Sequence, residues 1–292
     1  MMVRVQPGAS VIGLPGATVT ATSPVPARRS ALSKALPFAG VHVACLAAIW
    51  YPPTLGLVLL ALAGYAVRMW AITAGYHRYF SHRSYRTGRV FQLVMAYLGS
   101  TSLQQGPLFW SSCHRRHHKH SDQAGDPHSP RAGFWHAHVG WIFDGTNGHA
   151  DLSNVKDLSA YPELRWLDRH HYLSVISYAL ICYAIAGMGG VIWGFVISSV
   201  AVVQITLLIN SLAHRWGTRR YATTDDSRNN ALLAVLTLGE GWHNNHHHEM
   251  TSARQGFRWW EIDLTYYSLR ILARLGIVWG VREPRRALST RH

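Results

Sequence analysis

Residues 112–122 read Ser-Cys-His-Arg-Arg-His-His-Lys-His-Ser-Asp, and this stretch decides how the rest of the chain is interpreted. Residues three and four apart share one face of an α-helix, so His114, His117 and His118 can point to the same place. The same H-x2-H-H spacing recurs within residues 243–247. Imidazole is a ligand for zinc, copper, iron and nickel, so two such clusters predict a site with more than one metal ion.

Two further pairs of polar residues extend this pattern. His77 and His82 are five residues apart, about 140° around a regular α-helix. They cannot share a face of such a helix, so either the helix ends near His77 or the two residues serve different metal ions. Asn210 and His214 are one helical turn apart at the end of an apolar run, where both can join the cluster.

The composition favours a membrane protein. Only 14% of the 292 residues are charged and 48% are hydrophobic, with 12 Trp and 13 Tyr available for membrane interfaces. The formal net charge of +14 indicates anionic partners. The sequence contains no recognised nucleic-acid-binding motif, so we expect a membrane partner and no nucleic-acid partner. The three cysteines form no disulfide framework.

Apolar runs predict four membrane helices in two hairpins. The second run, 54–74, would be roughly 31 Å long as a helix, enough to cross a bilayer. Residues 90–103 are only moderately apolar and predict an interfacial or buried segment. The four predicted membrane helices are residues 36–50, 54–74, 172–188 and 191–213.

The distribution of positive charge orients these helices. Arg68 lies within the second run, and every other Lys and Arg lies outside the four runs and outside the hairpin tips, 51–53 and 187–190. The positive-inside rule therefore places all the histidine clusters and both termini in the cytoplasm of a protein integral to the cell (inner) membrane. The predicted parts are a disordered N-terminal tail (1–34), a membrane domain (35–270) with a cytosolic cap formed by 75–171 and 214–270, and a C-terminal tail (271–292).

The kinds of metal site compatible with this pattern are few. Carboxylate-rich di-iron bundles need two Glu-x-x-His pairs, and this chain has one such spacing, from Glu240 to His243. The H-E-x-x-H motif of zinc proteases is absent. A site supplied almost wholly by neutral imidazoles at a membrane face suits two irons that activate O2 against an unreactive C–H bond, with an acyl chain as substrate.

Four motifs in series resemble those of the membrane fatty acyl desaturases of the stearoyl-CoA Δ9 type. They are HRYFSH at 77–82, HRRHHKHSD at 114–122, NSLAH at 210–214 and GEGWHNNHHH at 239–248. The stretches DPH at 126–128 and GFWHAHVGW at 133–141 also match, and the likeness covers roughly residues 38–265.

The resemblance implies an all-α integral membrane protein, with four transmembrane helices carrying a helical cytosolic cap that holds a histidine-bound di-iron site. It implies that Asn210 binds one iron through a water molecule. It also implies that Trp141 and Tyr65 contact the substrate, with Tyr65 limiting the length of the acyl chain. The implied iron ligands are His77, His82, His114, His117, His118, His214, His243, His246 and His247.

The implied reaction uses O2 and two electrons to introduce a cis double bond, expected at Δ9, into a saturated long-chain acyl substrate. After Gly140-Trp141, acyl-CoA members carry a Val-Arg-Lys-type run, whereas residues 142–147 here read IFDGTN. The acyl carrier is thus CoA, acyl carrier protein or a membrane lipid. With no fused haem domain in the sequence, electrons are expected from a separate ferredoxin or cytochrome.

Two alternatives remain open from the sequence. One is a lipid or alkane hydroxylase with the same histidine-rich di-iron architecture. The other, from a different class, is a non-catalytic haem or zinc membrane protein.

Overall fold

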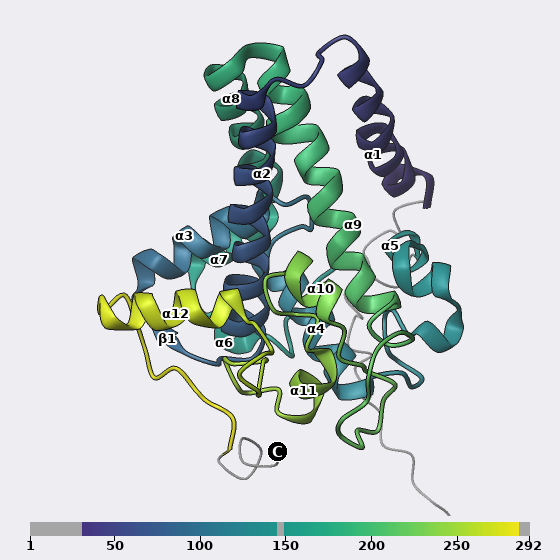
Figure 1. The fold of residues 1–292 in the computed structure, drawn as a ribbon, viewed down its shortest axis with the longest axis vertical. Helices are drawn as coiled ribbons and strands as arrows, with labels where there is room; N and C mark the ends of the chain where they lie inside the picture. Colours follow the sequence, from purple (N-terminus) through teal and green to yellow (C-terminus); the bar gives the residue numbers. More distant parts are fainter. Residues whose placement is uncertain (1–30, 145–148, 286–292) are drawn as a thin grey trace, which may run out of the picture.

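The computed structural model describes residues 31–144 and 149–285, which are mostly helical (Figure 1). An upright group of helices stands above a more compact part made of shorter helices and loops (Figure 1). We call these two parts the column and the cap. The column consists of α1 (Ala31–Ala44) with the 3-10 helix η1 (Cys45–Ile49), α2 (Leu55–Trp70) with the π-helix η2 (Ala71–Ser81), and α8 (His171–Gly190) with the π-helix η6 (Val191–Ile197) and α9 (Ser198–Ser211).

The column reverses direction at two tips. Pro52 and Pro53 separate η1 from α2, and Thr54 caps α2 by accepting a hydrogen bond from the backbone N–H of Leu57. At the other tip, Ala186 and Gly187 leave helical geometry inside α8, and Gly187 has a positive φ of 56° that suits glycine.

The reversal at the second tip brings the two arms of the hairpin together. Tyr178 donates a hydrogen bond to the carbonyl of Gly194 at 2.9 Å. A Cβ atom added to Gly190 would lie 2.1 Å from the carbonyl oxygen of Cys182, so the close approach requires glycine. The helical stretch from His171 to Ser211 is thus two helices packed against each other.

Two helical stretches are long and apolar enough to cross a membrane, namely Leu55–Ser81 and His171–Ser211, and a shorter apolar helix covers Ser33–Ile49. The predicted second span ended at residue 74, but the helix continues as η2 to Ser81. Every residue of η2 is buried, because this end of the helix passes into the cap rather than into solvent. The predicted fourth span, 191–213, is helical as far as Ser211.

The cap is held together by one core of aromatic and aliphatic side chains. Tyr76 and Phe80 of η2 pack there with Met95, Leu108 and Leu164, all of them fully buried. The cap helices are α3 (Arg89–Ser100), α4 (Pro107–His120), the 3-10 helix η3 (Pro130–Ala132), the π-helix η4 (His136–Gly140), α5 (Trp141–Phe143), α6 (Lys156–Ser159), α7 (Pro162–Arg169), α10 (Ala231–Leu236), α11 (His243–His248) and α12 (Leu264–Arg274).

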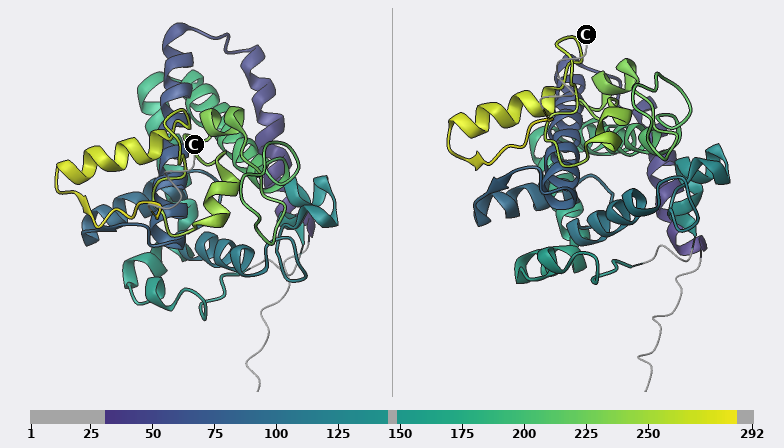
Figure 2. Two further views of the ribbon diagram at one scale, coloured as in Figure 1. Left: turned by 60° about the horizontal axis from the view of Figure 1, so that its bottom comes forward. Right: turned by 90° about the horizontal axis from the view of Figure 1, so that it is seen from below.

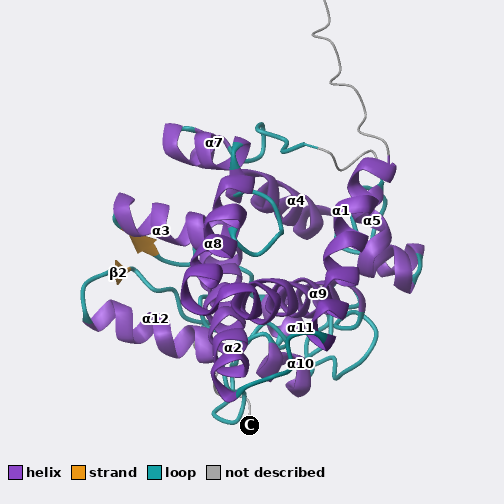
Figure 3. Ribbon diagram, turned by 90° about the horizontal axis from the view of Figure 1, so that it is seen from above, coloured by secondary structure: helices purple, strands orange, loops and turns teal. Residues whose placement is uncertain are grey.

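The described strands form one small antiparallel pair, β1 (Arg86–Thr87) with β2 (Val278–Trp279). β1 comes just before α3 and β2 just after α12, so the pair joins the outer ends of these two helices (Figure 3).

The predicted C-terminal boundary at residue 270 falls inside α12. The described residues beyond α12 pack on the cap: Val278 is buried, and Arg282 donates a backbone hydrogen bond to Ser84 and accepts one from Ala253. These backbone pairings depend on residues far away in sequence, which is why a local pattern did not predict them. The predicted N-terminal tail lies outside the described residues except for 31–34, which begin α1.

Candidate metal centre

The nine histidines predicted as ligands lie together beneath the column in two groups. Within each group, the nitrogen atoms offered as ligands lie within 4.8 Å of one another. The first group consists of His77, His82, His114, His118 and His246, and the second of His117, His214, His243 and His247.

Each H-x2-H-H motif supplies both groups. On α4, His114 and His118 are one turn apart and belong to the first group, whereas His117 points to the second. On α11, His246 belongs to the first group, and His243 and His247, again one turn apart, belong to the second. Two short helices thus lie between two sites and share their imidazoles between them.

The pair His77 and His82 corrects one sequence expectation. Neither predicted alternative holds: the helix does not end near His77, and both residues belong to the first group. The chain adopts π-helical geometry in η2, where hydrogen bonds join residues five apart. The backbone N–H of His82 accordingly donates to the carbonyl of His77 at 3.2 Å, and the two rings lie 4.8 Å apart.

The imidazole nitrogens are spaced as ligands of a common ion would be. Two nitrogens bound at about 2.1 Å in neighbouring positions around one metal ion lie roughly 3 Å apart. The Nε2–Nε2 distances between paired rings match that value: His77–His246 3.0 Å, His82–His114 2.8 Å, His118–His246 3.0 Å and His214–His243 3.1 Å.

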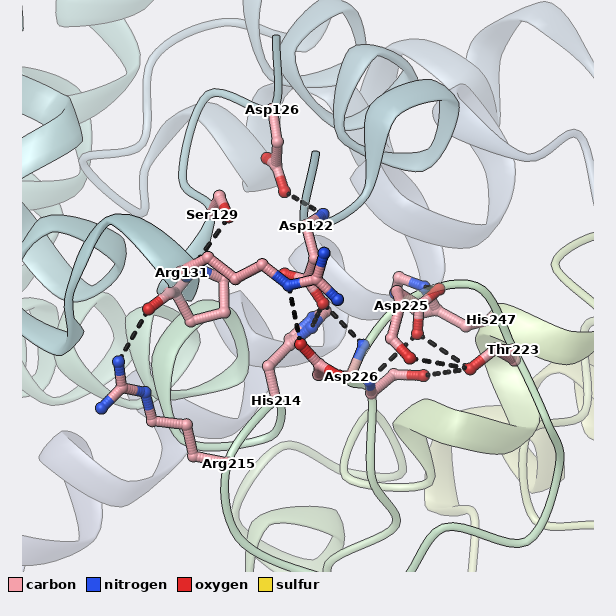
Figure 4. A network of polar contacts seen from close by, with 12 residues as sticks. Asp122, Asp126, Ser129, Arg131, His214, Arg215, Thr223, Asp225, Asp226 and His247 are labelled. Carbon is pink, nitrogen blue, oxygen red and sulfur yellow. Dashed lines mark hydrogen bonds and ion pairs between the residues drawn. The ribbon is translucent and has the colours of Figure 1, made fainter. Parts of the chain in front are cut away.

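Carboxylates hold the opposite nitrogen of three rings in the second group. The Nδ1 atoms of His117, His214 and His247 lie 3.0, 2.9 and 2.8 Å from Asp126, Asp122 and Asp225, respectively. Figure 4 shows two of these contacts, Asp122 with His214 and Asp225 with His247. An Nδ1–H that donates to a carboxylate leaves the Nε2 lone pair free for a metal ion, the usual arrangement around bound metals.

The first group has one carboxylate of this kind. The Nδ1 of His77 pairs with Glu240. Glu240 also accepts a hydrogen bond at 3.0 Å from Arg78, whose guanidinium is buried and pairs with Asp263 as well. Burial acts to raise the pKa of Glu240, but the charges of His77 and Arg78 outweigh it and lower the pKa to about 2. The carboxylate therefore stays ionised beside the imidazole.

The environment favours the neutral form of six of these imidazoles. Burial, reinforced by the positive charge that neighbouring rings would carry, lowers the pKa well below its usual value for His82, His114, His118, His243 and His246. For His247, burial is opposed by Asp225, and the pKa is lowered to about 4. Neutral imidazole is the form that binds metals, so the donor type, spacing and protonation fit two metal ions, one in each group.

The four carboxylates were not predicted from the sequence. Asp122, Asp126 and Glu240 each lie within a few residues of a histidine motif, and this proximity in a chain of only 14 acidic residues was an available signal. Asp225 lies far from any motif in sequence and carries no such signal.

A hydrogen-bonded bridge beside the first group was also missed. The indole of Trp110 stacks on the ring of His114, with centroids 4.9 Å apart. Its N–H donates to Gln104 at 3.1 Å, and the Gln104 amide donates to Thr206 on α9 at 3.1 Å. The bridge links α9 of the column to the first histidine group.

The three other predicted site residues, Asn210, Trp141 and Tyr65, lie on different elements and have different neighbours. Asn210 is half-buried on α9, one turn before His214. Trp141 packs with its ring 5.2 Å from that of His128, which in turn packs on His117. Tyr65 lies higher in the column and donates a hydrogen bond to the carbonyl of Leu236 in α10 at 2.5 Å.

Comparison with known proteins agrees with this site. The family model for fatty acid desaturases matches residues 48–279, so the chain belongs to the fatty acid desaturase family. It is therefore an oxidoreductase that introduces double bonds into fatty acyl chains, and the resemblance found in the sequence is confirmed.

Curated relatives match over most of their length. The chain is 38% identical to "Probable lipid desaturase ADS3.2, chloroplastic" of Arabidopsis thaliana, over 87% of this chain and 71% of that protein. It is 37% identical to "Acyl-CoA C20 Delta5-desaturase" of Anemone leveillei (84% and 80%) and to "Delta-9 acyl-lipid desaturase 1" of Arabidopsis thaliana (88% and 85%). Since members of this family are desaturases, membership does not support the alternative of a non-catalytic haem or zinc protein.

Proposed function

We propose that the nine histidines hold two iron ions and that the protein desaturates a long-chain acyl substrate with O2. The observation that carries the proposal is the convergence of paired Nε2 atoms, 2.8–3.1 Å apart, from histidines spread between residues 77 and 247. When bound, two irons supply the redox chemistry by which O2, two electrons and two protons remove two hydrogens from adjacent methylenes, giving a cis double bond and two waters.

The chain's own residues position this chemistry. Asp122, Asp126, Asp225 and Glu240 retain the Nδ1 protons of their histidines and so keep the Nε2 atoms available. Asn210 would hold a water molecule beside the second group. The stacked indole of Trp110, fixed through Gln104 to Thr206, borders the first group and is suited to orienting an apolar chain.

Four membrane crossings complete the proposal. Long apolar side chains are exposed around the column, including Leu59 and Leu62 on α2 and Leu180 and Ile185 on α8. Such exposure suits contact with lipid chains. Since the hairpin tips carry no Lys or Arg, we place them on the far side of the cell (inner) membrane and the histidine groups and both termini in the cytoplasm.

We infer that the product is a Δ9 double bond and that the acyl chain is carried by a membrane lipid. Two of the relatives support the lipid carrier, since one is named as a Δ9 acyl-lipid desaturase and one as a probable lipid desaturase, although another is named as an acyl-CoA Δ5-desaturase. Tyr65 and Trp141 are proposed to contact the acyl chain. Electrons come from a separate ferredoxin or cytochrome, whose acidic surface would be attracted by the positive charge of the chain.

The test is expression of the full chain in a host that lacks unsaturated fatty acids. We expect monounsaturated fatty acids in the lipids, identified by gas chromatography with mass spectrometry, and about two irons per purified chain. A product that gains an oxygen instead of losing two hydrogens would indicate the hydroxylase alternative. An active preparation without iron would refute the proposed metal.

A pair of variants in one histidine run separates ligands from bystanders. His246→Ala should abolish product formation and lower the iron content, because the Nε2 of His246 lies beside the Nε2 atoms of two other rings of the first group. His248→Ala is the matched control: this ring is exposed and stacks on Tyr221, with centroids 4.0 Å apart. Equal iron and product in the two variants would contradict the assignment.

A further inference from the structure

Two helices, α3 and α12, project sideways from the lower end of α2, roughly perpendicular to the column (Figure 1). Figure 2 shows α12 extending away from the body in two further views. Their outer ends are joined by β1 and β2, and Thr87 donates a hydrogen bond to the carbonyl of Ile277 at 2.8 Å. We call α3, β1, β2 and α12 together the wing.

Both helices of the wing carry an apolar face that the described residues do not cover. On α3 it consists of Val90, Leu93 and Val94, with Val90 80% exposed. On α12 the residues of this face recur at three- or four-residue steps and are Leu264, Tyr267, Ile271 and Leu275. Ile271 is 57% and Leu275 67% exposed. This spacing gives each helix one continuous stripe.

The contacts of α3 with α2 and η2 show which way its stripe points. Phe91, about 100° around the helix from Val90, packs on Trp70 with ring centroids 6.4 Å apart. Gln92, a further 100° around α3, accepts a hydrogen bond from Tyr79. Tyr79 lies nine residues after Trp70, further along α2 and η2 toward the cap. Going around α3 from Val90 to Phe91 to Gln92, the contacts with α2 and η2 thus move toward the cap. Val90 therefore points away from the cap, toward the exposed apolar part of the column.

The contacts of α12 show that its stripe also points away from the cap. Ser268, about 40° from the centre of its stripe, accepts a hydrogen bond from the indole of Trp70 at 2.7 Å. Thr265, about 100° from that centre, contacts Thr73, which lies deeper, at 2.9 Å. Leu264 and Ile271, at the centre of the stripe, point toward the column tips. The two stripes thus form one surface with a common direction.

The height of the wing matches the end of the lipid-facing part of α2. Exposed apolar side chains on α2 run from Leu55 to Val67, and from Arg68 onward the helix is almost wholly buried. The stretch from Leu55 to Trp70 is about 23 Å long, most of the roughly 30 Å hydrocarbon thickness. The wing is attached at Trp70, so its apolar surface continues the apolar surface of the column at a right angle.

We propose that the wing lies in the interfacial zone of the lipid bilayer, with the stripes of α3 and α12 inserted at the boundary between headgroups and acyl chains. The inference rests on the membrane topology proposed above. Continuity with the column and the shared direction of the stripes favour the bilayer as the occupant. Arg274, an exposed residue of the last turn of α12, lies beside the stripe, where it can meet lipid phosphates, as in amphipathic helices that lie on membranes.

The test uses spin labels on the full chain in phosphatidylcholine–phosphatidylglycerol vesicles at low protein-to-lipid ratio. Cys45, Cys113 and Cys182 are replaced by alanine, and retained product formation shows that this background folds. Single cysteines are then introduced by Val94→Cys and Ile271→Cys on the wing. Two reference labels are Leu59→Cys on the column and Thr251→Cys, an exposed residue of the cap.

We expect labels at 94 and 271 to collide more often with O2 than with a water-soluble nickel chelate, as at 59, whereas the label at 251 shows the reverse. Wing labels that behave like residue 251 would overturn the inference while leaving the topology intact. A label at 59 that also behaves like 251 would instead refute the membrane crossings. If the wing labels are shielded from the nickel chelate only at high protein-to-lipid ratio, a second copy of the chain covers the wing. That result would also overturn the inference.

Discussion

At the scale of single residues, the site depends on which nitrogen each imidazole presents. Four histidines have Nδ1 tied to a carboxylate, and each of these four carboxylates also accepts a hydrogen bond from another residue. Asp225 accepts hydrogen bonds from Ser227 and Thr223, and Asp122 accepts one from the backbone N–H of Asp226 (Figure 4). A second layer of side chains thus orients the histidines of the two groups.

This layer can be tested at Asp225. Asp225→Asn keeps the size of the side chain but removes the charge that orients His247, so we expect a 10–100-fold loss of iron affinity or activity. Iron is measured by mass spectrometry on the purified protein and product by gas chromatography. Asp226→Asn is the matched control, because its carboxylate pairs with Arg131 at the surface and should leave both readouts unchanged. Equal losses in the two variants would show that the orientation of His247 is not the cause.

Tyr65 gives a second prediction at this scale. Tyr65→Ala should admit longer acyl chains, because it removes a large side chain from the column, and should cost about 1 kcal/mol or more through the lost hydrogen bond to Leu236. Tyr65→Phe loses the same hydrogen bond but keeps the ring, so its chain-length profile should match that of the parent. The measurement is the chain-length distribution of products. An unchanged distribution in Tyr65→Ala would show that Tyr65 only packs between helices.

At the scale of elements, α11 shows how a very short helix can supply three of the nine proposed ligands. His243, His246 and His247 face the two histidine groups, and the two asparagines face the other way. Asn245 is fully buried, donates to Glu261 and the Gln255 carbonyl, and accepts from Asn229. Asn244 accepts backbone hydrogen bonds from Arg220 and Tyr221. The run His-Asn-Asn-His-His thus contains both the ligands and their anchor.

Metal removal should therefore loosen α11 selectively. The helix has six residues and no side-chain cap at its N-terminus, so it depends on its partners for stability. A bound metal stabilises the folded state that binds it, and its removal withdraws that stabilisation. After chelation we expect faster amide hydrogen exchange in α11 and in the last turn of α4, a lower Tm, and little change in α8. Uniform exchange across the chain before and after chelation would contradict the proposed ligand role.

At the scale of the whole molecule, the column is apolar outside, and the cap contains a buried polar cluster beside its apolar core. Exposed leucines and isoleucines surround the upright helices, while the buried polar groups gather around the histidines below them. One charged residue lies buried inside α2 of the column. Arg68 is fully buried and donates hydrogen bonds to Ser199 and to the carbonyls of Gly64 and Thr101, with its guanidinium 4.5 Å from the Tyr178 ring centroid. Its charge is thus satisfied by groups of α2, α8 and α9 and by Thr101 at the end of α3.

The proposed topology makes a prediction for the two tips. In intact cells, Pro52→Cys and Met188→Cys should react with a membrane-impermeant maleimide added from outside, because both residues lie at column tips without Lys or Arg. Thr251→Cys, on the cap, should react only after the membrane is opened. The measurement is a shift in gel mobility after labelling. Labelling of only one tip from outside would mean that one hairpin does not cross.

Much of the architecture could be read from local patterns. The two H-x2-H-H repeats, the apolar runs and the charge-free tips at 51–53 and 187–190 are all visible in short windows, and the structure brings all nine predicted histidines together. These predictions succeed because helical periodicity and transfer of apolar residues from water are properties of neighbouring residues. The same local reasoning was wrong for His77 and His82, because it assumed regular α-helical geometry where the chain is π-helical.

The sequence by itself determined the chemistry available to this protein: which side chains can bind metal, which segments avoid water, and where positive charge accumulates. Only the tertiary structure decided how the histidines divide into two groups, which carboxylates orient them, and which way the apolar stripes of the wing point. These features depend on contacts between residues far apart in the chain, such as His77 with His246 and Trp70 with Ser268. No periodicity in a single segment encodes such contacts, because each one arises from the packing of the whole chain.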